Sequence, residues 1–303
     1  MNRVLVTISC AACAFVLATA ASATTMTVTQ TTDGPTLASA LGGGGGLTID
    51  SSSITNGDDA QFGTFTNFTS PPVTIGDGDV LSTGFAENTT AASHSDLNLP
   101  SNNMGVGGTP EFNAYGPGHI TNFEDSNDVA ALVVNFTLSA PSQVGFDFIF
   151  GSVEYPVFVG SFTDSFLAFL DGTAVTDQIV YDSSGQAVQV GTTFSSELTT
   201  ADTNSAFSDP HGLVKLQTFT DVLSAGSHSI VFEVGDVNDH ILDSAVFLSN
   251  LHAGTGPIGT GPSTSTISTI PAVPEPGSFA MFGIGIACLI AGSWRKRREL
   301  SRP

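Results

Sequence analysis

A run of alternating phenylalanines places the strongest constraint on how this chain can fold. In residues 144–150, Phe146, Phe148 and Phe150 occupy every second position, so an extended strand would direct all three rings to one face. An α-helix has a period of 3.6 residues and would spread the same rings around its circumference. We therefore expect a β-strand here, with these three rings pointing into a core.

Short segments of similar character fill the central part of the chain. They are rich in Val, Ile, Thr and Phe, and turns of Gly, Pro, Asn and Asp separate them. This pattern predicts an all-β fold, specifically a two-sheet β-sandwich of jelly-roll type. The expected strands span residues 47–54, 62–68, 129–138, 144–150, 164–170, 178–181, 213–219, 229–234 and 244–251.

Local signals before the central strands predict three further features. Residues 36–41 have the pattern of a short helical turn, and the five glycines at 42–46 indicate a flexible joint before the first strand. Asn56 and Gly57 lie between two expected strands, and Asn-Gly is a common hairpin turn. We therefore expect residues 47–54 and 62–68 to form a hairpin.

Both ends of the chain carry targeting signals. Residues 1–23 contain Arg3, an apolar run and small residues at Ala21 and Ala23, as in a secretory signal peptide with its cleavage site. Near the other end, apolar residues 279–294 predict one transmembrane helix, and the bases after it would remain on the cytoplasmic side. The C-terminal signal comprises a motif, Val273, Pro274, Glu275 and Pro276, and a basic stop, Arg295, Lys296, Arg297 and Arg298.

The order of motif, apolar helix and basic cluster resembles the PEP-CTERM sorting signal of Gram-negative bacteria. The resemblance implies an inner-membrane-anchored precursor that an exosortase-type membrane protease recognises and processes. An ordinary single-span anchor with a proline-rich stalk is the alternative, and both interpretations place the preceding residues outside. The expected organisation is a signal peptide (1–23), an ectodomain (24–253), a linker rich in Gly, Pro, Ser and Thr (254–272) and a sorting signal (273–303).

The ectodomain lacks cysteine and is strongly acidic. Cys10, Cys13 and Cys288 all lie in the terminal signals, so no disulfide can support the domain. Of the 28 Asp and Glu residues only Glu275 and Glu299 lie outside residues 24–273, and Lys215 is the only Lys or Arg within them. About 25 net negative charges repel nucleic acid and favour bound cations, Ca²⁺ in particular. A solvated acidic coat without specific sites is the alternative.

Three ordered blocks resemble the bacterial choice-of-anchor L domain. They are the Val-Leu-Ser-Thr-Gly strand at residues 80–84, the Phe-rich block at 146–166 with Glu154-Tyr155-Pro156, and the Asp-Ser-Ala-Val-Phe block at 243–247. The resemblance spans residues 36–251 and implies a surface-displayed β domain with a variable C-terminal anchor. It does not imply catalysis. Val153 and Thr163 replace a Glu and an Asn of the family pattern, which removes two possible oxygen ligands.

Acidic residues near the last two strands form the densest group of oxygen ligands. Their spacing is not that of an EF-hand, but a loop followed by a strand can gather them at one end of the sandwich. Local hydrogen bonding in turns is the alternative explanation. We expect Asp77 and Asp79, in Gly-Asp-Gly-Asp, to be turn residues. The candidate metal ligands are Glu154, Asp164, Asp236, Asn238, Asp239 and Asp243.

The sequence carries no recognisable enzyme motif. It has no nucleophile elbow, zinc-protease motif or phosphate-binding loop, and a Glu154–Asp164 pair would serve glycoside hydrolysis only across an open cleft. We expect a non-enzymatic adhesive or structural component of the exopolysaccharide envelope, with exosortase and exopolysaccharide as partners. The alternative is a Ca²⁺-dependent carbohydrate-binding module, although Tyr and Trp, the usual sugar platforms, number only three and one.

Overall fold

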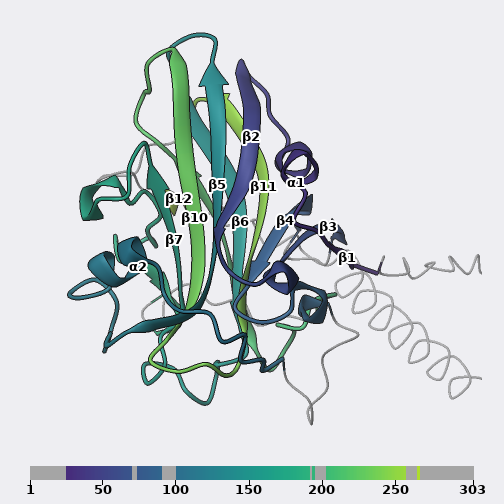
Figure 1. Cartoon of the computed structure of the whole chain (residues 1–303), viewed down its shortest axis with the longest axis vertical. Coiled ribbons are helices and arrows are strands. Elements are labelled where there is room, and N and C mark those ends of the chain that lie inside the picture. The colour runs from purple at the N-terminus through teal and green to yellow at the C-terminus, as the bar shows by residue number, and fades with distance from the viewer. Residues whose placement is uncertain are drawn as a thin grey trace, which may run out of the picture.

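Two antiparallel β-sheets pack face to face (Figure 1). The computed structural model describes residues 25–69, 74–90, 100–191, 193–194, 203–256 and 265–266. The predicted two-sheet β architecture is confirmed, whereas the jelly-roll topology stays a prediction. The signal peptide and the sorting signal lie outside the described residues. Among the residues described, no helix has the length and apolar character needed to span a membrane.

The larger sheet has the strand order β1-β3-β4-β11-β6-β9-β12, and the smaller one β2-β5-β10-β7-β8. The strands of the larger sheet are β1 (Thr27–Gln30), β3 (Phe62–Phe68), β4 (Gly76–Ser82), β11 (Ser244–Gly254), β6 (Gln143–Ser152), β9 (Gly212–Phe219) and β12 (Ser265–Thr266). Those of the smaller sheet are β2 (Leu47–Asn56), β5 (Ser126–Leu138), β10 (Gly226–Val237), β7 (Ser165–Leu170) and β8 (Val188–Gln189). The helices are α1 (Gly34–Leu41) and α2 (Pro110–Tyr115), with 3₁₀ turns η1 (Asp59–Gln61), η2 (Ala86–Thr89) and η4 (Val175–Asp177).

The alternating phenylalanines of β6 point into the core between the sheets, as predicted. Phe146, Phe148 and Phe150 are each at most 1% exposed. Phe146 meets Phe232 of β10 with ring centroids 5.0 Å apart, and Phe148 meets Phe166 of β7 at 4.9 Å. These contacts join the two sheets directly.

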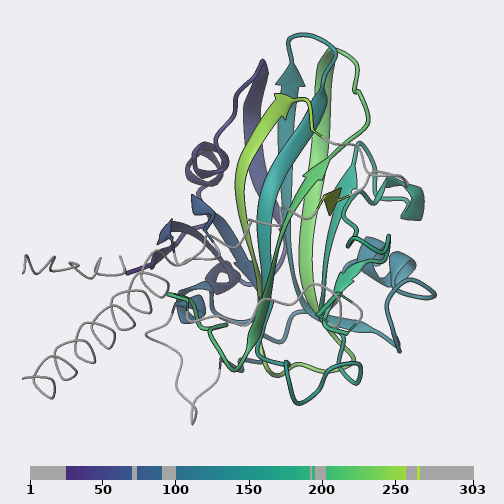
Figure 2. The ribbon, with the colours of Figure 1, turned by 180° about the vertical axis from the view of Figure 1, so that it is seen from behind.

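The outer faces of both sheets are also covered. On the larger sheet Phe68 and Phe247 pack edge to face at 4.9 Å, which explains why β11 is buried on both sides. On the smaller sheet Phe112 and Tyr115 of α2 join a second apolar cluster with Phe169. Seen from behind, the yellow-green β11 lies beside β6 (Figure 2).

The predicted hairpin at Asn56-Gly57 is wrong, because β2 and β3 belong to different sheets. The side-chain amide of Asn56, the last residue of β2, donates to the carbonyl oxygen of Val129 at 2.8 Å. This bond holds the end of β2 against β5. Asp58 and Gln61 then form a capping box that starts η1. A cap followed by a crossover thus replaces the two-residue turn.

The predicted glycine joint at residues 42–46 is also wrong. The run follows β1 and α1, and it packs against the end of β11: the Ala253 amide donates to the Gly44 carbonyl at 3.0 Å. A Cβ atom on Gly45 would lie 1.8 Å from the Ala253 carbonyl oxygen, and the φ of Gly45 is positive. Glycine is needed here for close approach and not for flexibility.

Most predicted strands are present with slightly different ends, but residues 178–181 do not form a strand. Gln178 and Tyr181 make only isolated bridges, to Phe169 and Ala187. After β11, the amide of Gly256 donates to the Gln143 side chain at 3.3 Å, so Gly256 lies at the end of β6 opposite to Ser152. The chain is next described as β12, which pairs with β9 in the same sheet.

Candidate metal centre

Four strand ends bring the predicted acidic residues to one end of the sandwich. Ser244 at the start of β11 pairs with Ser152 at the end of β6. In the other sheet, Ser165 at the start of β7 pairs with Gly235 near the end of β10. The neighbouring positions in sequence carry four of the predicted ligands: Glu154, Asp164, Asp236 and Asp243.

Three carboxylates of this group come close enough to share one ion. One oxygen each from Glu154, Asp164 and Asp239 lies within 4.8 Å of the other two. Oxygens bound to a common Ca²⁺ at about 2.3 to 2.6 Å are at most about 5 Å apart, so the spacing fits this ion. Glu154 and Asp164 are fully buried, whereas Asp239 is half-buried.

Several oxygens of the group have no hydrogen-bond partner. Both carboxylate oxygens of Glu154 and both of Asp236 are buried without one, as are Asp239 Oδ1 and Asp243 Oδ2. The Thr83 hydroxyl lies near enough to Asp236 to lower its pKa, but it makes no hydrogen bond of ordinary geometry. Buried carboxylates without partners are costly, which indicates that a positively charged species or protons belong here.

Asp164 is held by two hydrogen bonds from neighbouring strands. Its Oδ1 accepts from the Val237 amide at 3.1 Å, and its Oδ2 accepts from the Ser244 hydroxyl at 2.6 Å. Each oxygen retains a further lone pair for a metal ion. These bonds fix the orientation of the carboxylate, as outer partners commonly do around metal ligands.

Burial raises the pKa of every predicted carboxylate in this group. The pKa of Glu154 rises to about 9, first through burial and then through the charges of Asp164 and Asp239. Burial raises the pKa of Asp164 to about 8 against its two hydrogen bonds, and that of Asp243 to about 7. The pKa values of Asp236 and Asp239 are also raised, mainly by burial. Without a cation, the group therefore holds protons near neutral pH.

Asn238 belongs to the same loop but directs its side chain elsewhere. Its Oδ1 accepts from the Glu124 amide at 2.8 Å, and its Nδ2 donates to the Asn122 carbonyl at 2.8 Å. Its φ of 76° lies in the left-handed region, which asparagine tolerates better than most residues. Asn238 thus stabilises the loop and is not part of the cluster of carboxylates.

Two residues outside the predicted ligand set support this end of the domain. Asp128 is fully buried, and its oxygens accept from the amides of Met104 and Val106 at 3.0 and 2.8 Å. Gly84 has no room for a side chain, because a Cβ atom there would lie 1.8 Å from Asp243 Oδ2. No spacing motif links these residues to the loop around Asp239.

The predicted turn role of Asp77 and Asp79 is wrong, because both lie within β4. Asp77 is exposed, and its Oδ1 accepts from the Asn67 amide at 2.8 Å. Asp79 is fully buried, and neither of its oxygens has a hydrogen-bond partner. Burial raises its pKa well above the usual value.

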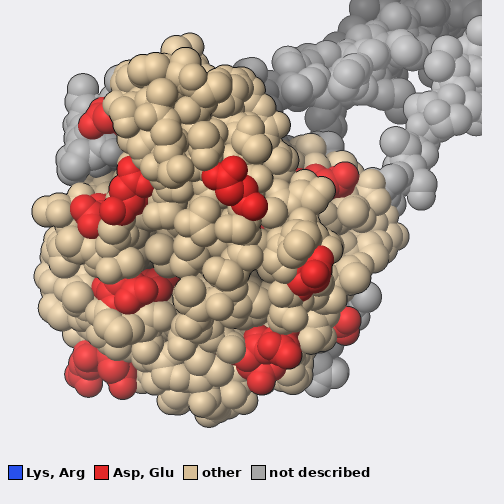
Figure 3. All heavy atoms as spheres, turned by 45° about the horizontal axis from the view of Figure 1, so that its top comes forward, with Lys and Arg blue, Asp and Glu red and all other residues tan. Residues whose placement is uncertain are grey.

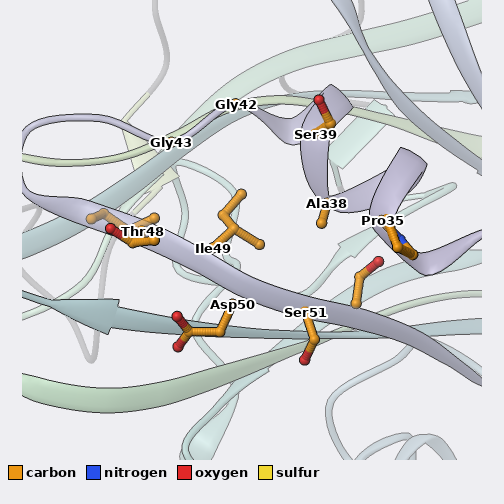
Figure 4. A pocket seen from close by; sticks show the side chains of 11 residues that line it. Pro35, Ala38, Ser39, Gly42, Gly43, Thr48, Ile49, Asp50 and Ser51 are labelled. Atoms are coloured by element: carbon orange, nitrogen blue, oxygen red, sulfur yellow. The ribbon is translucent and has the colours of Figure 1, made fainter.

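The remaining surface offers a groove and a broad acidic field. A groove of about 530 Å³ lies between α1 and β2 and is lined by small apolar and hydroxyl side chains, including Ala38, Ser39 and Ile49 (Figure 4). Its single acid, Asp50, accepts a hydrogen bond from Thr137 at 2.7 Å. On the face in Figure 3, acidic side chains are scattered and no Lys or Arg is visible.

The domain is mostly β, with two packed antiparallel sheets, a cluster of buried carboxylates at one end and no disulfide. The sequence model of the choice-of-anchor L domain family matches residues 24–252, and the chain belongs to this family. The PEP-CTERM protein-sorting motif matches residues 272–298. No curated protein and no solved structure matches the chain.

The two matches together define where the protein goes. A PEP-CTERM motif implies recognition by an exosortase membrane protein, with export and sorting to the cell surface in Gram-negative bacteria. The chain is therefore a surface protein that an exosortase sorts.

Proposed function

We propose that this protein is a non-enzymatic adhesive or structural component of the exopolysaccharide envelope, such as a biofilm matrix. The observation that carries the proposal is the presence of a choice-of-anchor L domain and a PEP-CTERM motif in one chain. Its acidic surface supports a role in a hydrated matrix, because strong negative charge keeps the domain soluble. The precursor is anchored in the inner membrane through its tail and passes to the surface after processing.

The buried positions of the carboxylates favour a structural role over a catalytic one. Glu154 and Asp164 are both fully buried, so neither can reach a glycosidic bond from its present position. A glycosidase requires its two carboxyl groups on opposite sides of a bound sugar. We therefore propose no hydrolytic activity.

A second candidate function is a Ca²⁺-dependent carbohydrate-binding module. The cluster of carboxylates at one end of the domain favours this function, since a bound ion can order loops that contact a ligand. Exposed Phe85 and Phe158 lie near this end in sequence, adjacent to Gly84 and four residues after Glu154. They offer apolar surface, although neither is a Tyr or Trp.

A combined glycan-binding and cell-aggregation assay separates the two functions. We expect cells that display the protein to aggregate more than cells lacking its gene, with no binding of defined sugars on a glycan array. Cells carrying a chain without residues 272–298 provide the control, because the domain is then made but not sorted. Sugar binding that a chelator abolishes would favour the carbohydrate-binding module. Equal aggregation with and without the gene would overturn the adhesive role.

A further inference from the structure

We propose that Glu154, Asp164 and Asp239 bind one Ca²⁺ ion, and that this ion joins loops of the domain as a disulfide would. The ligand atoms lie within 4.8 Å of one another, a spacing that one Ca²⁺ can bridge. This site is internal to the fold, so its occupancy depends on neither exosortase nor exopolysaccharide.

An independent observation supports the ion: Glu154 is buried without partners. Its side chain is fully buried, and neither of its oxygens has a hydrogen-bond partner. A carboxylate normally accepts several hydrogen bonds, and leaving it buried without any destabilises the fold. A local turn role, the alternative explanation of these acids, would leave such hydrogen bonds in place. The turn acid Asp182 illustrates that case, because its Oδ1 accepts from the Ser184 and Gln186 amides.

The chemistry of the ligands selects Ca²⁺ among common metal ions. All three donors are carboxylate oxygens, and the domain has no cysteine for a softer metal. The nearby His240 directs its Nδ1 to Asp128 Oδ2, 3.5 Å away. Mg²⁺ requires ligands at about 2.0 to 2.1 Å in a strict octahedron, whereas Ca²⁺ accepts a wider and less regular set.

Two further acids lie beside the site but are not among its three proposed ligands. Asp236 is fully buried beside Asp164, and Asp243 uses its Oδ1 to accept from the Asn102 amide at 2.7 Å. Their charges interact with that of Asp164 and attract a cation to the site. The concentration of negative charge therefore favours a divalent ion over Na⁺.

The ion would connect segments that the backbone leaves far apart in sequence. Glu154 follows β6, Asp164 precedes β7, and Asp239 lies between β10 and β11. The same end holds residues 100–106 through hydrogen bonds to Asp243 and Asp128. A cation therefore stabilises this end as a cross-link, in a domain that has no cysteine to form one.

Terbium luminescence tests the site directly in the full-length protein held in detergent. Tb³⁺ replaces Ca²⁺ at oxygen sites and emits when a neighbouring aromatic ring is excited, and Tyr155 directly follows Glu154. We expect saturable emission at one Tb³⁺ per chain, reversed by Ca²⁺ at lower concentration than by Mg²⁺. Tyr155→Phe should remove most of this emission while Ca²⁺ still binds in calorimetry. Tyr181→Phe, a change on a different strand connection, should leave the emission intact.

Substitution of one proposed ligand provides a second test of the metal site. Asp239→Asn should weaken Ca²⁺ binding by more than about tenfold, the loss that even outer-sphere partners can cause. Asp125→Asn is the matched control, because Asp125 is an exposed acid at the same end of the domain. Asp239 is half-buried, and an unchanged circular dichroism spectrum will show that its variant is folded. Equal Ca²⁺ affinity in the Asp239→Asn and Asp125→Asn variants would overturn the site.

Discussion

Replacing Asp79 with asparagine tests whether the domain folds around a neutral carboxyl group. Asp79 lies in β4 between β3 and β11, and it pairs with Thr64 and Leu248. It is fully buried without a hydrogen-bond partner, and burial raises its pKa well above the usual value. The folded protein therefore keeps this proton at pH values where the unfolded chain has lost it.

The sign of the pH effect follows from proton linkage. The folded state binds the proton more tightly, so stability is highest below the unfolded-state pKa of about 3.9 and falls as the pH rises toward the raised folded-state pKa. One such group changes the free energy of unfolding by about 1.4 kcal/mol per pH unit. Asparagine has nearly the same shape and does not titrate. The advantage of Asp79→Asn over the parent should therefore grow by about 1.4 kcal/mol for each pH unit in this window.

Thermal melts of the parent and the variant measure this difference. For a domain of this size, about 1 kcal/mol moves the Tm by about 2 to 4 °C, so the two Tm values should diverge by about 3 to 6 °C per pH unit. Asp77→Asn is the control, since Asp77 is exposed on the same strand, and its Tm curve should diverge from that of the parent less than the curve of Asp79→Asn does. The carboxylates at the loop end titrate in all three proteins, so their contribution cancels. Parallel Tm curves for Asp79→Asn and the parent would refute the reasoning.

Three further predictions concern the core, the cation and the tail. Phe148→Ala should destabilise the domain by about 3 to 5 kcal/mol, because it empties the contact with Phe166; a melt like that of the parent would contradict the assigned strand face. Ca²⁺ at a hundredfold excess over Kd should stabilise the parent by about 2.7 kcal/mol relative to EDTA, and Asp239→Ala should remove most of this gain. An equal rise of Tm in NaCl of matched ionic strength would leave charge screening as the explanation. Replacing the bases at residues 295–298 with Ser should reduce surface display, measured by antibody labelling of intact cells; unchanged display would count against the sorting role.

The sequence predicts the strands best where periodicity and burial agree. The alternation in residues 144–150 specifies both the strand β6 and its inward face, because only one face of that pattern carries aromatic rings. Turn signals are less reliable, since Asn56-Gly57 and Gly76-Asp77-Gly78-Asp79 have high local turn preference but occupy a crossover and a strand. Pairing of β4 with β3 and β11 overrides that preference.

The candidate site is predicted in part, for a similar reason. The order of strands brings Glu154, Asp164 and Asp239 together, as predicted from the sequence. An amide such as that of Asn238 looks equally suitable as a ligand in the sequence, but its hydrogen bonds to residues 122 and 124 are visible only in three dimensions. Asp128 is more than a hundred residues from the last loop and carries no motif, so only the fold reveals its place.

The strand β11 connects the two ends of the sandwich in a single pass. This strand starts beside the carboxylate group at Ser244 and ends at Gly254, about 35 Å away at about 3.4 Å per residue. Beyond Gly254 the described chain stays on the larger sheet, because β12 pairs antiparallel with β9 at Thr218 and Gln217. This last strand therefore runs back in the direction of the acidic loops, since β9 starts beside Ser152 and ends beside Gly145.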